Sequence, residues 1–94
     1  MKTLQLKSFT FKNAKEETTY KELLMAVLDN PRETGVKVSE LRIRLAILDK
    51  LEVAENSLEL EDTETNLLKE LVADMSWVKI DKGILLFNDE IQAM

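Results

Sequence analysis

The chain has 94 residues, of which 45% are hydrophobic and 33% are charged, and its formal net charge is −5. This length is sufficient for one domain, residues 1–94, and too short for two. Cysteine and histidine are both absent, which excludes disulfides, thiolate nucleophiles, Ser-His-Asp triads and zinc sites built on Cys or His.

The N-terminal segment alternates as a strand does. Apolar side chains fall on even positions up to Leu6 and on odd positions from Phe9. Residues 3–11 are therefore expected to be extended, with a bulge or a break into two short strands at the change of parity. Residues 17–19 can return as a second strand, so we expect an N-terminal β-hairpin at about 3–19.

A first helix is predicted at 20–29. Thr19 and Glu22 have the spacing of a capping box, which satisfies the free backbone N–H groups of a helix start. Pro31 ends the helix, because proline disfavours the α conformation of the residue before it.

A second helix is predicted at 40–54, with Ser39 as its N-cap and a short strand over Val36–Val38 before it. Its expected core face consists of Leu41, Leu45, Leu48 and Leu51, widened by Ile43 and Ile47. Arg42 and Arg44 are about 200° apart on such a helix. They cannot form one phosphate clamp, and we expect them to be a solvated flank.

A third helix is predicted at 62–76, from an amphipathic pattern formed by Leu67, Leu68, Leu71, Val72 and Met75. Trp77 follows it and is expected to anchor the core because of its large area. The last segment can be read as a hairpin turning at Lys82 and Gly83 or as a helix at 82–93. The helix is favoured, because Ile84, Phe87 and Ile91 recur at i, i+3 and i+7.

These elements predict an α+β, mainly α, single domain with a short N-terminal hairpin and about four helices. A winged-helix-like arrangement is possible, with 62–76 as the recognition helix and a wing around Lys82 and Gly83. The charge of that helix disfavours DNA binding, because it carries the acidic residues Glu64, Glu70 and Asp74 and only one basic residue, Lys69.

Acidic residues concentrate after position 50. Residues 1–50 carry ten basic and seven acidic side chains, whereas residues 51–94 carry three and eleven. Six carboxylates lie between Lys50 and Lys69 without a base among them: Glu52, Glu55, Glu59, Glu61, Asp62 and Glu64. They form the expected interaction surface for a basic protein partner, since such a field attracts cationic surfaces and repels phosphate. The last three also have a structural interpretation, as the start of the third helix, where carboxylates favour the dipole.

The sequence offers no catalytic constellation. Every Asp and Glu falls on an expected polar face, in a cap or in a connector, so none has the apolar pocket that general acid catalysis requires. The oxygen spacing of an EF-hand and glycine-rich phosphate loops are absent. We therefore expect no enzymatic activity, no metal and no cofactor.

No apolar stretch approaches the roughly 20 residues that span a bilayer, and the N-terminus lacks the apolar region of a secretory signal. The expected compartment is the cytoplasm.

The spacing of several segments is similar to that of small proteins from tailed-phage and prophage genomes. The segments are 11–13, 19–24, 35–36, 39–42, 48–52, 58–62, 67–69, Met75 and Trp77. The resemblance carries no catalytic motif and no functional residue. It implies an accessory factor that binds a host or phage protein in the host cytoplasm, or a minor part in virion assembly.

The sequence thus favours a non-enzymatic, phage-type acidic module that binds and modulates a larger basic protein, such as a nucleic-acid-processing machine. The alternative is a structural or assembly protein of a virion, and a third is a winged-helix DNA-binding protein.

Overall fold

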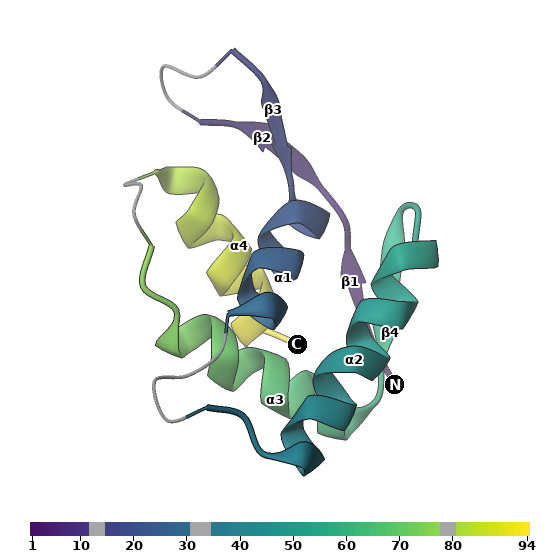
Figure 1. Ribbon diagram of the computed structural model, residues 1–94. Coiled ribbons are helices and arrows are strands. Elements are labelled where there is room, and N and C mark those ends of the chain that lie inside the picture. Colours follow the sequence, from purple (N-terminus) through teal and green to yellow (C-terminus); the bar gives the residue numbers. More distant parts are fainter. Residues whose placement is uncertain (12–14, 31–34, 78–80) are drawn as a thin grey trace.

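The computed structural model describes residues 1–11, 15–30, 35–77 and 81–94 (Figure 1). Within them the fold is α+β with helix predominant, as the sequence predicts. In chain order the elements are β1 (Lys2–Gln5), β2 (Ser8–Thr10), β3 (Glu17–Thr19), α1 (Tyr20–Asp29), α2 (Val38–Val53), β4 (Ser57–Leu60), α3 (Asp62–Asp74) and α4 (Lys82–Gln92).

The strands form two separate antiparallel ribbons. β2 and β3 make a hairpin that projects from the helices (Figure 1). β1 instead pairs with the distant β4, and Leu4 lies opposite Leu58 with both side chains buried. The predicted change of parity is thus a break between two strands. The hairpin expected at about 3–19 is correct only for β2 and β3, because β1 needs β4 to close its apolar face.

Two helices begin at side-chain caps, and the first of these is the one that the sequence predicts. Thr19 Oγ1 accepts a hydrogen bond from the backbone N–H three residues later, at 3.1 Å. The carboxylate of Asp81 accepts one from the N–H of Gly83 at 2.8 Å and so caps α4. The helix predicted at 82–93 is confirmed, and Lys82 and Gly83 form its first turn. The wing that a winged helix would place there is therefore wrong.

The boundaries of the two middle helices differ from prediction. α2 starts at Val38, and its N-cap is Lys37 without a side-chain hydrogen bond, so Ser39 is not the cap. The strand predicted over Val36–Val38 is wrong. A strand needs a hydrogen-bonded neighbour, and the described strands pair only with one another, β1 with β4 and β2 with β3. α3 ends at Asp74 and not at 76, since the next residue is already extended.

The core face of α2 also differs. Leu41 and Leu45 are 43% and 50% exposed, whereas Arg44 is only 3% exposed and Ile47 and Leu51 are fully buried. The predicted face is therefore right at Ile47 and Leu51 and wrong at Leu41 and Leu45, while Ile43 and Leu48 are partly buried against the core. α2 carries apolar residues on several sides, so periodicity alone does not select the buried face.

Arg44 is the residue that fixes α2 against α1. One guanidinium nitrogen donates to the carbonyl oxygens of Leu28 and Asn30, at 3.0 and 2.9 Å, where α1 ends. The guanidinium also pairs with Glu40 one turn earlier, with Nε and Nη2 at 3.1 and 3.0 Å from one carboxylate oxygen. The expected solvated flank is thus wrong for Arg44 and holds only for Arg42, which is exposed.

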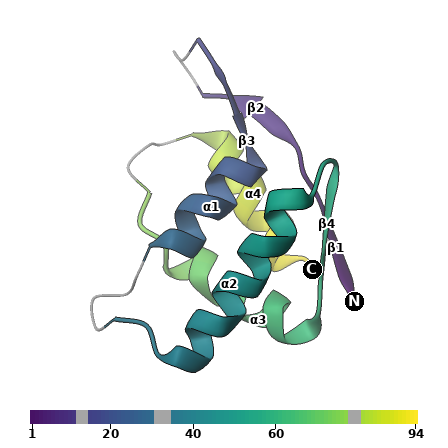
Figure 2. The same ribbon diagram turned by 45° about the vertical axis from the view of Figure 1, so that its right-hand side comes forward.

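Lys21 makes the reciprocal contact. Its ammonium group donates to the carbonyl oxygens of Glu52 and Ala54, at 3.3 and 3.1 Å, where α2 ends. Each of the two helices therefore places a cation at the negative end of the other, which stabilises unpaired carbonyl groups and the helix dipole. The two helices lie side by side in both ribbon views (Figure 2).

An aromatic chain links the hairpin to the helices. Ring centroids are 6.3 Å apart between Phe9 and Tyr20, 5.0 Å between Tyr20 and Phe87, and 6.1 Å between Phe87 and Trp77, all edge to face. Trp77 is half-buried and packs against the core, as predicted. The Phe9 ring also lies directly on Gly83, where an added Cβ would meet its atoms at 2.2 to 2.8 Å. Close approach, not turn geometry, therefore explains a glycine in a helix start.

We expect Arg44→Met to lower the free energy of unfolding by about 2–4 kcal/mol, because it leaves buried carbonyl groups without donors. Arg42→Met, on the exposed side of the same helix, is the matched control and should change it by less than about 0.5 kcal/mol. Urea unfolding measures both. Equal effects of the two substitutions would contradict the anchoring role of Arg44.

Gly83→Ala should also destabilise the fold, by about 1–3 kcal/mol, although alanine is the better helix former. The three heavy atoms nearest to the added Cβ all belong to Phe9. In a Phe9→Ala background, Gly83→Ala should therefore become neutral or stabilising by up to about 1 kcal/mol. A cost that persists in that background would mean that Phe9 is not the reason for the glycine.

Candidate functional site

The predicted acidic surface lies along one edge of the molecule. The chain runs from the end of α2 through β4 to the start of α3, which is the right-hand edge of Figure 1. Five of the six predicted carboxylates are exposed there: Glu52, Glu55, Glu59, Glu61 and Asp62. We call these five residues the acidic edge.

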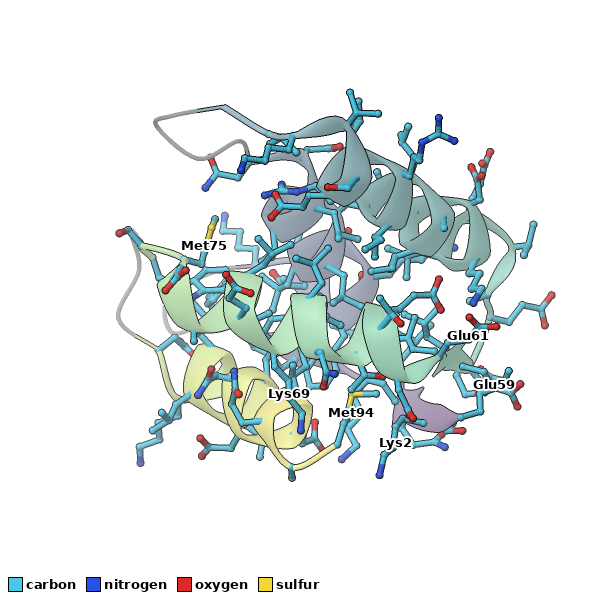
Figure 3. The ribbon with its side chains drawn as sticks, turned by 90° about the horizontal axis from the view of Figure 1, so that it is seen from below. Lys2, Glu59, Glu61, Lys69, Met75 and Met94 are labelled. Atoms are coloured by element: carbon cyan, nitrogen blue, oxygen red, sulfur yellow. The ribbon has the colours of Figure 1, made fainter. Side chains whose placement is uncertain are left out.

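β4 sets the direction of the central carboxylate. Leu58 and Leu60 point into the core, so Glu59 between them points outward, opposite Thr3 of β1. Figure 3 shows Glu59 and Glu61 projecting at one end of the molecule, with Met75 at the other. The alternation in Leu58-Glu59-Leu60 could already be read from the sequence, whereas its partner strand could not.

Glu64 does not belong to this exposed set. It is 6% exposed, and one carboxylate oxygen lies 2.5 Å from Lys50 Nζ of α2. The same oxygen accepts a hydrogen bond from the backbone N–H of Glu61 at 2.9 Å, as part of a reciprocal capping box. The structural interpretation of the third helix start is thereby confirmed for these residues. Glu64 joins α2 to α3 and is not available at the surface.

A second cluster of ionisable groups was not visible in the sequence. The carboxylate of Glu90 on α4 accepts hydrogen bonds from Lys7 Nζ, between the two ribbons, and from the Tyr20 hydroxyl of α1. Burial would raise the pKa of Glu90, but the hydrogen bonds from Lys7 and Tyr20 outweigh it, so the pKa lies below its ordinary value. Burial and the neighbouring carboxylate both raise the pKa of Tyr20.

This cluster ties the hairpin, α1 and α4 together. Tyr20 is 1% exposed, which leaves its hydroxyl out of reach of a substrate. Since the shifted groups satisfy one another, we assign the cluster a structural role. No sequence signal links three residues so far apart in the chain.

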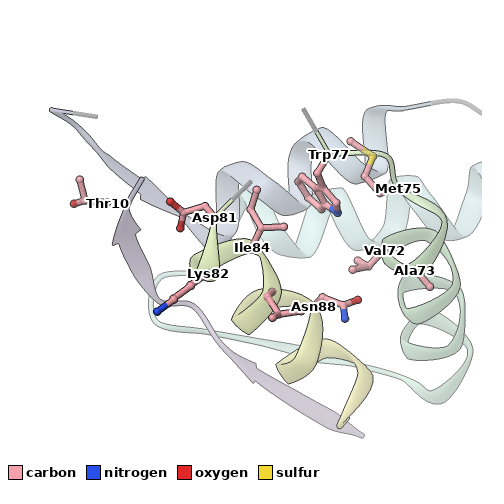
Figure 4. Close-up of a pocket in the computed structure, with 10 residues that line it drawn as sticks. Thr10, Val72, Ala73, Met75, Trp77, Asp81, Lys82, Ile84 and Asn88 are labelled. Carbon is pink, nitrogen blue, oxygen red and sulfur yellow. The ribbon is translucent and has the colours of Figure 1, made fainter. Parts of the chain in front are cut away.

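The described residues contain no group of three or more acidic side chains arranged to hold a metal ion. Among the same residues, no helix has the length and apolar character needed to cross a membrane. An open groove lies between the end of α3 and the start of α4 (Figure 4).

The chain matches no known family model, no curated protein and no solved structure.

The lowered pKa of Glu90 makes stability depend on pH. A carboxylate with a folded-state pKa below its unfolded value contributes stability that is fully present above about pH 4.3 and is lost as the pH falls through the folded value. Glu90→Gln should therefore be less stable than the natural chain at neutral pH, and the difference should shrink on acidification. Urea unfolding at several pH values measures it.

Asp89→Asn is the matched control, because Asp89 is the exposed neighbour of Glu90 on the same helix. Its stability should follow that of the natural chain across the range. A difference for Glu90→Gln that stays constant with pH would show that the ionisation of Glu90 is not what stabilises the cluster.

Proposed function

We propose that this chain is a non-enzymatic protein-interaction module whose acidic edge binds a basic surface of a larger protein, such as one that processes nucleic acid. The observation that supports it is the exposure of Glu52, Glu55 and Glu59, whose side chains have no role in the helix ends. Glu52 lies on α2, Glu55 in the connector and Glu59 on β4, so the edge draws its carboxylates from three successive segments and not from a single pair.

Two features of the neighbourhood strengthen the negative field. Lys50, the nearest base along the chain before the edge, is paired with the buried Glu64, so it does not neutralise the exposed carboxylates. Glu61 and Asp62 stand at the positive end of α3, where they stabilise the helix and still reach solvent. Complementary charge of this kind speeds association and selects partners more than it adds affinity.

The spacing resemblance to small proteins of tailed phages supports a setting in which such a module acts on host or phage machinery in the host cytoplasm. An assembly role in a virion is the alternative proposal. It would use the exposed apolar residues of α2, Val38, Leu41 and Leu45.

The test is an edge variant, Glu52→Lys with Glu55→Lys and Glu59→Lys, compared with the natural chain in affinity capture from bacterial lysate at low and high salt. Captured proteins are identified by mass spectrometry. We expect the natural chain to recover a basic protein at low salt and to lose it at high salt, because screening weakens exposed charges. The edge variant should not recover it under either condition.

The matched control makes the same charge change elsewhere, with Glu16→Lys, Glu22→Lys and Asp29→Lys, which are exposed on the hairpin and α1. It should recover the same partner as the natural chain. A partner that binds the edge variant equally well would overturn the proposed interface. Recovery of only untagged copies of the chain itself would replace the proposal with the assembly role.

A further inference from the structure

The solvent side of α2 carries a stripe of apolar side chains. Val38, Leu45 and Val53 are 64%, 50% and 80% exposed, and Leu41 at the flank of the stripe is 43% exposed. With 3.6 residues per turn, the first three lie within about 80° of one another around the helix axis. α2 also lies on the outside of the helices in both ribbon views (Figures 1 and 2). An exposed apolar stripe along a whole helix is typical of a surface that binds another protein.

The charged residues on the same side reverse in sign along α2. Arg42 lies in the first half of the helix, Asp49 lies on the same face in the second half, and Glu52 follows a turn later. All three are exposed, and none of them has an ion pair in the part of the chain that the structure describes. The other charged residues of α2 are paired inside the domain: Glu40, Arg44 and Lys50.

This reversal selects a second α2 as the complementary surface. An antiparallel copy sets the positive half of each helix against the negative half of the other, whereas a parallel copy sets like charges against each other. The helix dipoles also favour the antiparallel pair, because the positive end of each helix then lies beside the negative end of the other.

One register satisfies both the charges and the apolar stripe. Arg42 and Asp49 are equally far from the midpoint of α2, which lies between positions 45 and 46, and so are Val38 and Val53. A two-fold axis through that midpoint sets Arg42 of each copy opposite the partner's Asp49, and Val38 opposite the partner's Val53. The same axis brings Leu45 of each copy against the partner's Leu45. This side of α2 is thus complementary to itself, which is the requirement for a symmetric dimer.

We propose that a second copy of this chain covers the stripe, in a symmetric dimer in which α2 packs antiparallel against α2 of the partner. Such an interface uses the same surface on both copies, so it closes after two. Two helices of 16 residues overlap over about 24 Å and bury less surface than a permanent dimer does. We expect a weak dimer, with a dissociation constant of about 10–100 μM.

The dimer does not rest on the proposed function. Glu55 and Glu59 follow the end of α2, so pairing of the helices leaves them outside the interface. The dimer would carry two acidic edges, one at each end of the helix pair.

Sedimentation equilibrium tests the dimer, at chain concentrations from about tenfold below to about tenfold above that constant. Leu45→Lys should weaken self-association by at least about tenfold, since it sets two like charges against each other at the two-fold axis. Leu86→Lys is the matched control, because Leu86 is a 53% exposed leucine of α4, and it should associate as the natural chain does. Urea unfolding below the dissociation constant, where the chain is monomeric, confirms that both variants fold.

The charge pairing has a test of its own. Arg42→Glu and Asp49→Arg each set like charges opposite one another and should each weaken self-association by at least about tenfold. An equal mixture of the two variants should associate about as tightly as the natural chain, because each changed residue then meets the opposite charge on the partner. The mixed pair has the same total charge as the natural dimer, so a general change in repulsion does not explain a rescue.

The chain has no cysteine, so introduced cysteines report the direction of the pairing. In the antiparallel register the two copies of Val38→Cys, or of Val53→Cys, are about 22 Å apart, too far for a disulfide, which requires Cα atoms within about 7 Å. Each variant alone should therefore remain monomeric under mild oxidation in denaturing electrophoresis. A mixture of the two should give a disulfide-linked pair that contains one chain of each mass.

A natural chain that stays monomeric across the range, or that forms species larger than a dimer, would overturn the inference. Equal association of Leu45→Lys and Leu86→Lys, or a mixture of charge variants that associates no better than either alone, would do the same. Disulfides within the single cysteine variants and none in their mixture would mean a parallel pair. The double variant Glu55→Lys with Glu59→Lys should dimerise as the natural chain does, and its loss of dimer would place self-association at the acidic edge instead.

Discussion

The rest of this structure depends on the contact between Arg44 and the carboxyl end of α1. A guanidinium that donates to Leu28 and Asn30 can do so only with α2 rotated to one angle, and that angle buries Ile47 and Leu51 while Leu41 and Leu45 face solvent. The same rotation brings the end of α2 to Lys21. From there the chain enters β4 beside β1, and the acidic edge follows. A single buried cation thus helps to set the position of a surface that lies 8 to 18 residues later in the chain.

Helix ends organise the charges of the whole domain. Cations from neighbouring helices meet the carboxyl ends of α1 and α2, and carboxylates meet the amino ends of α3 and α4. This arrangement divides the acidic run into residues that the fold uses and residues that it leaves in solvent. Glu64 pairs with Lys50 and takes part in the capping box of α3, whereas Glu52, Glu55 and Glu59 take no part in the helix ends. Neither α3 nor α4 carries a basic side chain in its own last turn.

The sequence predicted the elements better than their partners. Local signals, such as Thr19 before α1 and the apolar period through Phe87 and Ile91, placed all four helices within two residues of their observed bounds. These local signals failed where a contact between residues distant in sequence determines the structure. Nothing near β1 indicates that β4 is its partner, and Gly83 argues against a helix until the Phe9 ring is found on it. For the candidate site, five of the six predicted carboxylates are exposed. The sequence could not distinguish Glu64 from them, because its ion pair with Lys50 forms only in the folded chain.

Composition and local pattern by themselves determined that the fold is α+β and mainly helical, with an acidic second half and without cysteine or histidine. They could do so because helix caps, periodicity and residue inventory act over a few positions. The tertiary structure decided which face of α2 is buried, which strands pair, which carboxylates remain in solvent and where a groove opens. Those outcomes depend on groups that meet only after folding, since hydrogen bonds to helix ends and the burial of a charge are set by neighbours distant in sequence.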